Sequence, residues 1–577
     1  MIEEYCERHG LGFFDERSHN QKIRIYFGLP LVDVDRRLIE LVDRVHQQTE
    51  TDSYMFLKTF SAPPPPHFAK SSPMNKLPQA PARSWRKTIR TWCIRAVLLC
   101  ILVIVLGIAV MVTRAFSLES QQIPVAAIQL PAVNAKAVER FSGALRFPTV
   151  SATGDFRPEV FQSLHRYLEE QFPLVHSKLQ REVVANFSLL YRWPGSDPDA
   201  QPILLMSHLD VVPVPDIEQR RWTHSPWSGE VADGYIWGRG AIDVKCGVLS
   251  QLEAVEHLLD QEFSPKQDVY FAFGHDEEVG GYDGNLQIAL KMRERGVRFR
   301  FVLDEGGVIV DGALPGLNSP LALVAVAEKG YATIQLSVDV QPGHSSMPPA
   351  QTAVGILAAA VTRLEQQPVP ASLTGPVSLM LNAVAPEMDF MPQVLLANRD
   401  VLAPVLLRKF SQSPTLNAFT RSTTAVTVFQ GGQHEGSLPG HAEALVNFRL
   451  LPGDSPEFVL EHVRHVVDDV RVECELRKGA LPIPPSLVSD HRSPDFLTLQ
   501  RVIRQVFPGV VVAPGLAVVA TDSRHYEGVA DNIYRFLPVQ LLAADLNRIH
   551  GIDERISVQN YHRVVQFMIL LIQQLTE

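Results

Sequence analysis

The sequence predicts an α/β catalytic domain, with a mixed and largely parallel sheet flanked by helices, and an inserted α+β domain. From about residue 135 to 328, and again over 453–577, short apolar runs alternate with amphipathic helical segments. This alternation is typical of a sheet covered by helices. Between these parts, over 329–452, several runs alternate apolar and polar residues, as half-buried antiparallel strands do.

Length, charge and cysteine content narrow the class of protein. A chain of 577 residues is too long for one ordinary core, so two or three domains are expected. A net charge of −10 disfavours a nucleic-acid partner, because phosphate binding needs basic patches. The five cysteines show no paired spacing, so neither a disulfide framework nor a thiolate metal site is indicated.

The N-terminal part predicts a membrane anchor. Residues 1–82 are expected to form a cytoplasmic extension that ends in a Pro-rich linker. Residues 96–113 carry no charge and as a helix would span about 27 Å, enough for a thin bilayer. A buried core helix is one alternative and a cleaved signal peptide is another, although no clear cleavage site is visible. We therefore expect a transmembrane signal anchor.

The charges around this run predict its orientation. Basic residues cluster before it, between 83 and 95, whereas Arg114 alone follows closely. The positive-inside rule then places the N-terminus in the cytoplasm and the catalytic domain in the lumen or outside the cell. The secretory pathway, the vacuole or lysosome, and the cell surface all fit. Asn186 begins a glycosylation sequon, Asn-Phe-Ser, which suits a lumenal domain.

Individual elements follow from the same patterns. The apolar runs predict catalytic-domain strands at 203–206, 269–273 and 301–303 and helices at 159–172, 248–259 and 286–295. In the insert, they predict strands at 333–340, 424–429 and 444–450 and helical pieces between 386 and 416.

Acidic and imidazole side chains follow the predicted strands. His208 and Asp210 come after the first strand, Glu277 and Glu278 after the second, and Asp304 closes the third. The carboxyl ends of such strands form the ligand site of an open α/β sheet. Nitrogen and oxygen donors with a nearby free carboxylate are what a two-metal hydrolytic site requires.

Each of these signals has a simpler reading when taken alone. A His-x-Asp triplet is usually a surface turn, and adjacent glutamates are most often a solvated pair. Asp243 alone is consistent with a helix cap. The set gains weight because every member follows an apolar run, in an order that one fold requires.

Several motifs carry a family resemblance over roughly residues 135–577. They are S-H-L-D-V-V-P-V at 207–214, W-x-x-x-P-W-S-G at 222–229, G-R-G-A-I-D-V-K at 238–245, G-H-D-E-E-V-G-G at 274–281, D-E-G-G at 304–307 and P-G-H-S-S-M-P-P at 342–349. The chain resembles the di-zinc metallopeptidase family of aminoacylase, carnosinase, bacterial glutamate carboxypeptidase and carboxypeptidase S. Further motifs at 355–366, 521–524 and 548–558 look most like its N-fatty-acyl-amino-acid synthase/hydrolase branch.

The resemblance implies two Zn²⁺ ions per chain and a role for each matching residue. The implied metal ligands are His208 and Asp304 on one zinc, Glu278 and His550 on the other, and Asp243 bridging both. Glu277 would be the general base, and Asp210 would orient His208. The family peptide bond after Asp243 is usually cis. Many members carry a second Asp where this chain has Val244, which leaves that geometry open.

Two residues of the insert complete the implied site. His344 looks like the family histidine that reaches a neighbouring subunit's site and stabilises the oxyanion, which implies a lid and a homodimer through the insert. Arg449 looks like the arginine that grips the substrate carboxylate. A surface arginine at a strand end is the alternative for Arg449.

The resulting hypothesis is zinc-dependent hydrolysis of the amide bond in N-acyl, especially N-fatty-acyl, amino acids, with the reverse condensation also open. A membrane-anchored carboxypeptidase or dipeptidase acting on short peptides is the first alternative, since the same chemistry serves both. An inactive binding protein is the second. The intact set of metal-ligating and acid–base side chains disfavours it.

Overall fold

The computed structural model describes residues 82–577, with side chains from residue 90 onward. The predicted cytoplasmic extension, all but Ala82, lies outside the described residues. From Arg95 onward the chain forms one compact unit, which contains both the large sheet and the insert.

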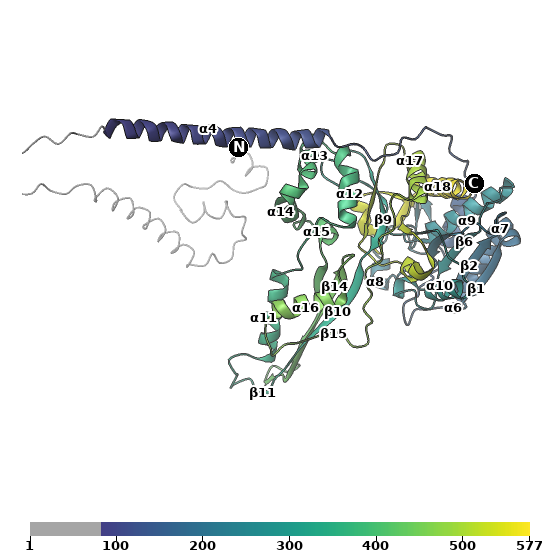
Figure 1. Cartoon of the computed structure of the whole chain (residues 1–577). Coiled ribbons are helices and arrows are strands. Elements are labelled where there is room, and N and C mark those ends of the chain that lie inside the picture. Colours follow the sequence, from purple (N-terminus) through teal and green to yellow (C-terminus); the bar gives the residue numbers. More distant parts are fainter. Residues whose placement is uncertain (1–81) are drawn as a thin grey trace, which may run out of the picture. The chain divides into compact units, whose positions relative to one another are not determined.

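The first described element is the long helix α4 (Ala82–Phe116), drawn in purple in Figure 1. Over Arg90–Phe116 this helix is long and apolar enough to cross a membrane, with a mean hydropathy of 3.1 in its 18-residue window, and 0% of that window is buried. Among the described residues, only a bent pair of helices, Phe390–Ala397 and Arg399–Phe410, passes the same test of length and composition.

The larger domain is built on a ten-stranded mixed sheet. Its strands, in spatial order, are β1 (Gln180–Val184), β2 (Ser188–Trp193), β6 (Val269–Gly274), β3 (Ile203–His208), β7 (Phe301–Asp304), β17 (Ile533–Arg535), β9 (Leu321–Glu328), β8 (Ile309–Asp311) and β18 (Gln540–Leu542), with β16 (Val511–Ala517) beside β9. The pairs β3–β6, β3–β7, β7–β17 and β9–β16 are parallel, and β1–β2 and β2–β6 are antiparallel. The predicted mixed and largely parallel sheet is confirmed.

Helices cover both faces of this sheet. In β6, Val269, Phe271 and Phe273 belong to one core cluster and Tyr270 and Ala272 to another, because successive side chains of a strand point to opposite faces. The first cluster includes side chains of α5 (Ala137–Ala144), α6 (Pro158–Gln171), α7 (Pro173–Lys178), α9 (Lys245–Asp260), α17 (Pro494–Val506) and α18 (Val558–Thr576). The second includes side chains of α10 (Asn285–Glu294) and the 3-10 helix η3 (Asp522–Val529).

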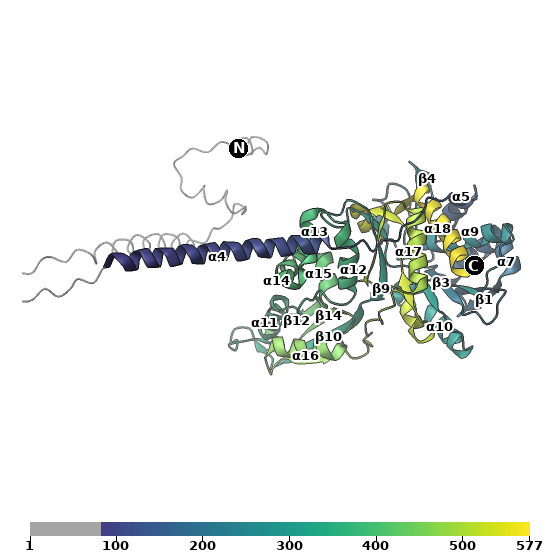
Figure 2. The ribbon, with the colours of Figure 1, turned by 45° about the horizontal axis from the view of Figure 1, so that its top comes forward.

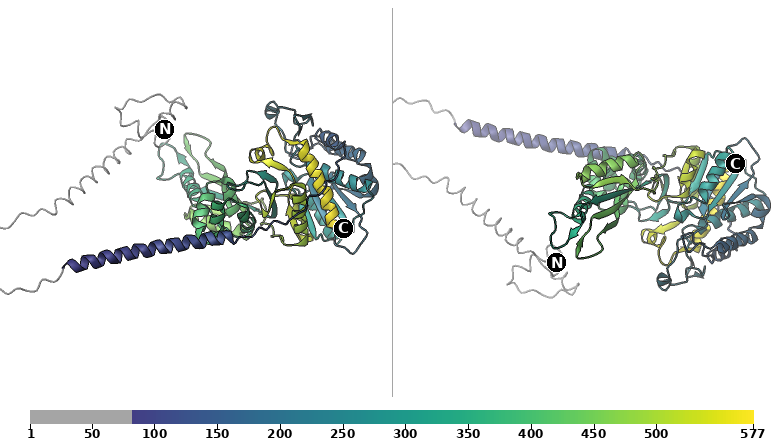
Figure 3. Two further views of the ribbon diagram at one scale, coloured as in Figure 1. Left: turned by 90° about the horizontal axis from the view of Figure 1, so that it is seen from above. Right: turned by 90° about the horizontal axis from the view of Figure 1, so that it is seen from below.

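The C-terminal helices show how the two ends of the sequence build one core. Helices α17 and α18 lie side by side (Figure 2), and α18, the long yellow helix, runs across the strands in the left view of Figure 3. Helix α18 also packs along α9. The core therefore joins the segments on both sides of the insert into one domain.

The insert has a sheet and a core of its own. Its antiparallel strands, in spatial order, are β12 (Thr423–Gly431), β14 (His441–Leu450), β10 (Gly330–Asp339) and β15 (Glu473–Leu476). Helices α11 (Ala353–Gln366) and α16 (Pro456–Val467) share a core cluster with this sheet. Because α16 and β15 belong to this core, the insert extends to Leu476, beyond the predicted limit at 452.

Further elements connect these two sheets. The helices α12 (Pro376–Val384), α13 (Phe390–Ala397), α14 (Arg399–Phe410) and α15 (Pro414–Thr420) form a cluster with apolar residues of β9 and β16. The predicted helical pieces therefore pack against the large sheet rather than against the sheet of the insert. The short elements are α8 (Asp216–Gln219), β4 (Val231–Ala232), β5 (Tyr235–Trp237), η1 (Glu277–Val279), β11 (Gly343–His344), η2 (Ala385–Glu387), β13 (Ser437–Leu438), η4 (Ala543–Arg548) and β19 (Arg555–Ser557).

Candidate metal centre and active site

The site begins where three parallel strands end. Strands β6, β3 and β7 are neighbours and run in the same direction, so the segments that leave their carboxyl ends meet at one edge of the sheet. His208 is the last residue of β3, and Asp304 is the last residue of β7. The two glutamates Glu277 and Glu278 form the 3-10 helix η1 just after β6.

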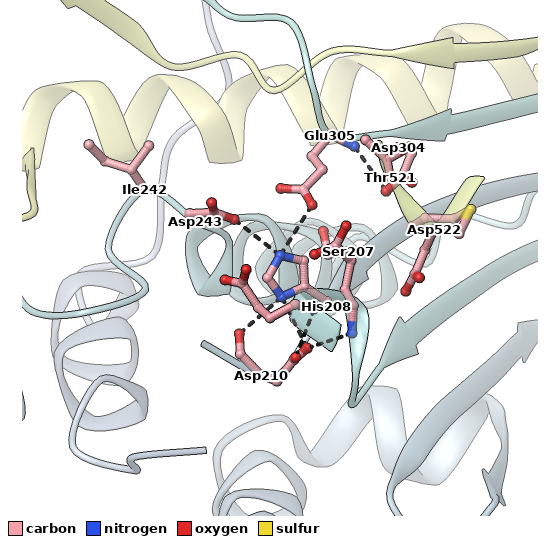
Figure 4. A network of polar contacts seen from close by, with 12 residues as sticks. Ser207, His208, Asp210, Ile242, Asp243, Asp304, Glu305, Thr521 and Asp522 are labelled. Carbon is pink, nitrogen blue, oxygen red and sulfur yellow. Dashed lines mark hydrogen bonds and ion pairs between the residues drawn. The ribbon is translucent and has the colours of Figure 1, made fainter. Parts of the chain in front are cut away.

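His208 is buried and held in one orientation. Its Nδ1 donates a hydrogen bond to the backbone oxygen of Asp210 at 2.9 Å. The second ring nitrogen, Nε2, lies 3.1 Å from Oδ1 of Asp243 and 3.1 Å from Oε1 of Glu305 (Figure 4). A neutral imidazole that donates through Nδ1 presents the Nε2 lone pair to a metal ion.

Asp243 lies between two histidines. Its Oδ1 faces His208, and its Oδ2 is 3.0 Å from Nε2 of His550. The peptide bond between Asp243 and Val244 is cis. A carboxylate with one oxygen directed at each of two imidazoles has the arrangement of a bridging ligand.

Glu278 and His550 complete a second group of donors. Nε2 of His550 lies 3.2 Å from Oε2 of Glu278. The other oxygen, Oε1 of Glu278, is buried and has no hydrogen-bond partner among the described residues. Such an orphaned buried oxygen is costly unless a cation or a proton satisfies it.

The donor atoms form two groups whose members all lie within 4.8 Å of one another. One group contains His208, Asp243 and Glu305, and the other contains Asp243, Glu278 and His550. Imidazole nitrogen and carboxylate oxygen are ligands that zinc accepts, and the shared aspartate gives each group a bridging member. The residues present therefore fit a pair of divalent cations.

Glu305, and not the predicted ligand Asp304, places its carboxylate beside His208. Both oxygens of Asp304 accept backbone hydrogen bonds, from the N–H of Glu305 at 2.9 Å and from the N–H of Ser523 at 2.8 Å. In Figure 4, the Glu305 side chain points toward His208, whereas Asp304 points toward Asp522. Asp304 is absent from both donor groups.

Asp210 supports the histidine and the two glutamates together. Its Oδ1 accepts the backbone N–H of Glu277 at 3.2 Å, and its Oδ2 accepts that of Glu278 at 3.1 Å. The hydroxyl of Ser151 donates to Oδ2 at 2.6 Å. One buried carboxylate thus fixes the loop after β6 relative to His208.

A buried ion pair links the backbone segments that carry Asp243 and His550. Glu554 Oε1 accepts the backbone N–H groups of Ile242 and Asp243 at 2.7 and 3.1 Å. Its Oε2 accepts from Arg239 at 2.6 Å, and Arg239 also donates to the backbone oxygen of His550 at 3.1 Å. This pair connects the loop of Asp243 to the distant segment of His550.

The electric charge of the site is unbalanced without cations. Burial raises the pKa of Glu305 to about 8 and holds the pKa of Glu277 well above its usual range. Hydrogen bonds to Asp243 and Glu278 raise the pKa of His550 to about 10. Crowded carboxylates in a low-dielectric site favour positive partners, which protons or metal ions can supply.

The two residues implied by the insert lie apart from these groups. His344 is exposed in β11, and its Nδ1 accepts hydrogen bonds from the N–H and hydroxyl of Ser346. Arg449 is half-buried in β14, with its guanidinium 5.0 Å from the ring centre of Tyr331. None of the hydrogen bonds or ion pairs between described residues links either one to the metal-ligating side chains.

Three supporting residues lie within the family motifs but were not predicted to belong to the site. Glu305 follows Asp304 in D-E-G-G, Arg239 lies in G-R-G, and Glu554 lies in the run at 548–558. Two adjacent acids after a strand are the available signal for Glu305. Nothing in the sequence pairs Arg239 with Glu554. The sequon asparagine, Asn186, is exposed in the turn between β1 and β2.

Comparison with known families places these features in context. The model of "Peptidase family M20/M25/M40" matches residues 204–574. The chain is 42% identical over 442 residues to a probable carboxypeptidase S-like protein of Dictyostelium discoideum, covering 75% of this chain and 84% of that protein. It is 42% identical over 440 residues to the N-fatty-acyl-amino acid synthase/hydrolase PM20D1 of Xenopus tropicalis, covering 76% and 85%.

Solved structures support the fold at lower identity. A metallo-carboxypeptidase from Sulfolobus solfataricus aligns with a TM-score of 0.55 at 17% identity, covering 76% of this chain and 99% of that one. Human carnosine dipeptidase 1 aligns with a TM-score of 0.52 at 18% identity, covering 76% and 96%.

Proposed function

Because this chain belongs to the M20/M25/M40 family of peptidases and is an amide-bond hydrolase, we propose that it is a zinc enzyme that cleaves N-fatty-acyl amino acids. The observation that carries the chemistry is the pair of donor groups that share Asp243. The proposed ligands are His208 and Glu305 for one ion, Glu278 and His550 for the other, and Asp243 for both. We assign Glu305 in place of the predicted Asp304, because the Glu305 carboxylate lies beside Nε2 of His208.

The protein side chains have separate tasks in this reaction. When bound, two zinc ions supply Lewis acidity for the carbonyl and acidify water. Glu277, which belongs to neither donor group, accepts a proton from the attacking water and returns it to the leaving amine. Asp210 keeps Glu277 in place through the backbone N–H.

The insert supplies the proposed contacts to substrate. Arg449 makes no ion pair with another described residue and stacks on Tyr331, so its planar guanidinium is available for the free carboxylate of the amino acid. His344 is exposed and belongs to no donor group. We therefore place it at the site of a neighbouring subunit, where it stabilises the oxyanion, and assign the insert to lid and dimer formation.

Mixed dimers test the shared site. A His344→Ala chain should lose activity and regain part of it when paired with a Glu277→Gln chain. One of the two sites in that dimer then has an intact base and an intact histidine. Absence of any recovery in dimers of verified composition would place His344 outside catalysis in trans.

The N-terminal helix gives the proposed location. We assign α4 to a single membrane span, with the N-terminus cytoplasmic and the catalytic domain lumenal or extracellular, because Arg90–Phe116 has the length and hydropathy of a span and buries none of its apolar window. The exposed Asn186 would then be accessible for glycosylation. Accessibility of Asn186 to glycosidase on intact vesicles tests this orientation.

A carboxypeptidase or dipeptidase is the second candidate function. The Dictyostelium relative named as carboxypeptidase S-like is as similar to this chain as the PM20D1 relative. Both substrates end in a free carboxylate, so the same grip by Arg449 would serve both. The two candidate substrates differ in the group on the acyl side of the amide bond, which is a fatty acid in one and an amino acid or peptide in the other.

Metal removal tests the zinc proposal. The full chain in detergent is stripped with a chelator, and amide hydrolysis is followed as zinc is added back. Activity should return only as the zinc content approaches two per chain. Full activity in the stripped protein, or with the zinc content below one, would contradict the two-metal site.

A further inference from the structure

The helices between the two sheets line an apolar cavity that is open to the surface. Its volume is about 450 Å³, within the range of sites that hold small organic molecules. Its walls come from α12, α13, α14, α15 and the segment 314–316, and include Leu314, Met380, Met388, Leu395, Leu406 and Phe410. No metal-ligating or acid–base residue named above lines it. The cavity therefore suits an aliphatic ligand and is separate from the proposed catalytic groups.

The outer side of two of these helices is apolar as well. Helices α13 and α14 meet at an angle of 114° and together pass the composition test for a broken span. We call this pair the elbow. Phe390 is 46% exposed, Met391 66%, Val401 69% and Val405 62%. Large apolar side chains gathered on an exposed element mark a surface that contacts an apolar partner.

Contacts tie the elbow to the end of the apolar helix α4. The side-chain amide of Asn398, between α13 and α14, donates to the backbone oxygen of Met111 at 3.0 Å. Arg114 pairs with Asp400 at 3.1 Å, and the ring centres of Phe116 and Phe390 lie 5.6 Å apart. The elbow therefore lies at the C-terminal end of the proposed span (Figures 1 and 2).

Basic side chains accompany this apolar surface. Arg408 and Lys409, in the last turn of α14, are exposed, and Lys409 also lines the cavity. Cationic side chains beside an apolar surface favour the boundary between phosphate headgroups and acyl chains. The combination is that of an interfacial helix pair rather than of a contact between two soluble domains.

We propose that the elbow lies in the leaflet where α4 ends, and that the cavity behind it takes the aliphatic chain of a phospholipid from that leaflet. The inference rests on the proposed membrane span of α4, because the span fixes which membrane lies beside the elbow. It is independent of the zinc chemistry. The enzyme would thereby hold its catalytic domain against a surface where amphiphilic molecules with long acyl chains concentrate.

Photocrosslinking in vesicles tests the proposal. The full chain is reconstituted into phosphatidylcholine vesicles that contain a phospholipid with a diazirine in its acyl chain. After irradiation, adducts are mapped by mass spectrometry. We expect adducts on peptides of α4 and also on the cavity-lining peptides of α13, α14 and α15. Adducts on α4 without any on the insert would overturn the proposal while leaving the span intact.

Two variants separate cavity binding from surface contact. Leu395→Trp adds volume to the cavity wall, and it should remove adducts from the cavity-lining residues while adducts on α4 persist. Leu487→Trp changes an exposed leucine, 76% exposed, that lies outside the insert helices and should leave both sets unchanged. Unchanged adducts on the cavity-lining residues in a folded Leu395→Trp protein would contradict cavity binding.

If Leu395→Trp does not fold, competition experiments on the wild-type chain test the proposal instead. Excess unlabelled phospholipid should then suppress the cavity adducts, whereas glycerophosphate, which has a headgroup and no chain, should not. Suppression by glycerophosphate would assign the site to the headgroup and overturn the proposal. Failure of the chain to remain with the vesicles, with no adducts on α4, would instead remove the membrane span on which the inference rests. The zinc-dependent activity would be unaffected by that result.

Discussion

The carboxylate of Glu305 lies 3.1 Å from Nε2 of His208, whereas its neighbour Asp304 accepts two backbone hydrogen bonds from Glu305 and Ser523. The two acids at the end of β7 thus have different roles. One faces the donor group with His208 and Asp243, and the other fixes the backbone that presents it.

This division predicts different outcomes for two conservative variants. Glu305→Gln keeps the shape of the side chain but loses its negative charge, so one zinc ion should be lost and kcat/KM should fall by about 100-fold or more. Asp304→Asn should keep both zinc ions, with a smaller loss, because it perturbs only the backbone bonds. Measurement of zinc content and kcat/KM on both proteins shows which of the two acids is the zinc ligand. Loss of zinc in Asp304→Asn alone would reverse the assignment.

Glu277 should be essential to turnover and dispensable for metal binding. Glu277→Gln removes the proton acceptor and should lower kcat by about 10²- to 10⁴-fold, the usual contribution of general acid–base catalysis. The zinc content should stay near two per chain, because Glu277 belongs to neither donor group. Zinc analysis beside the activity assay checks this. A variant that has lost metal would show that Glu277 is a ligand.

Removing one partner of the buried pair of Glu554 and Arg239 should destabilise the fold strongly. Both side chains are almost wholly buried and lie 2.6 Å apart. Glu554→Gln leaves the guanidinium without its counter-charge and should lower the free energy of unfolding by about 3 kcal/mol. Glu475→Gln is the matched control, because its partner Lys478 is 84% exposed and such pairs contribute less than about 1 kcal/mol. Denaturant unfolding measures both, and equal losses would contradict the argument.

His165 predicts a pH dependence of stability. Burial, and next the charge of Arg181, lower the pKa of His165 to about 4, below its ordinary value near 6.5. Between these values, the unfolded chain binds a proton that the folded chain does not. Stability is therefore full above pH 6.5 and is lost as the pH falls toward 4, by up to about 3 kcal/mol. His165→Gln should flatten this acid limb, and an unchanged limb would exclude His165 as its source.

The sequence predicts most of the fold because its strands are recognisable as short apolar runs. The apolar run at 269–273 is buried on both faces and reads as a central strand without any alignment. The limit of the insert was harder to predict. Helix α16 and strand β15 have patterns that either sheet could accept, and only long-range packing against β10 and α11 assigns them to the insert.

The site was predictable only in part, because some of its residues are brought together by contacts between distant segments. The chemistry of His208 and Glu278 follows from strand ends, and that of Asp243 from the motif G-R-G-A-I-D in the loop before α9. His550, more than 240 residues beyond Asp304, was predicted only through resemblance. Composition cannot decide between Asp304 and Glu305, because adjacent side chains point in different directions and the local backbone determines which one faces His208 and Asp243. The link from Glu554 to Asp243 and, through Arg239, to His550 exists only in three dimensions.

The most direct test of the central claim compares two substrates on one protein. The full chain in detergent, loaded with zinc, is given an N-oleoyl amino acid and, separately, a dipeptide such as Gly-Leu, and the released amino acid is quantified by mass spectrometry. Glu277→Gln serves as the blank. We expect release of the amino acid from the N-oleoyl compound, at a higher kcat/KM than for the dipeptide, and none with the variant. Cleavage of the dipeptide alone would assign the chain to the carboxypeptidase or dipeptidase alternative, and cleavage of neither would contradict the substrate proposal.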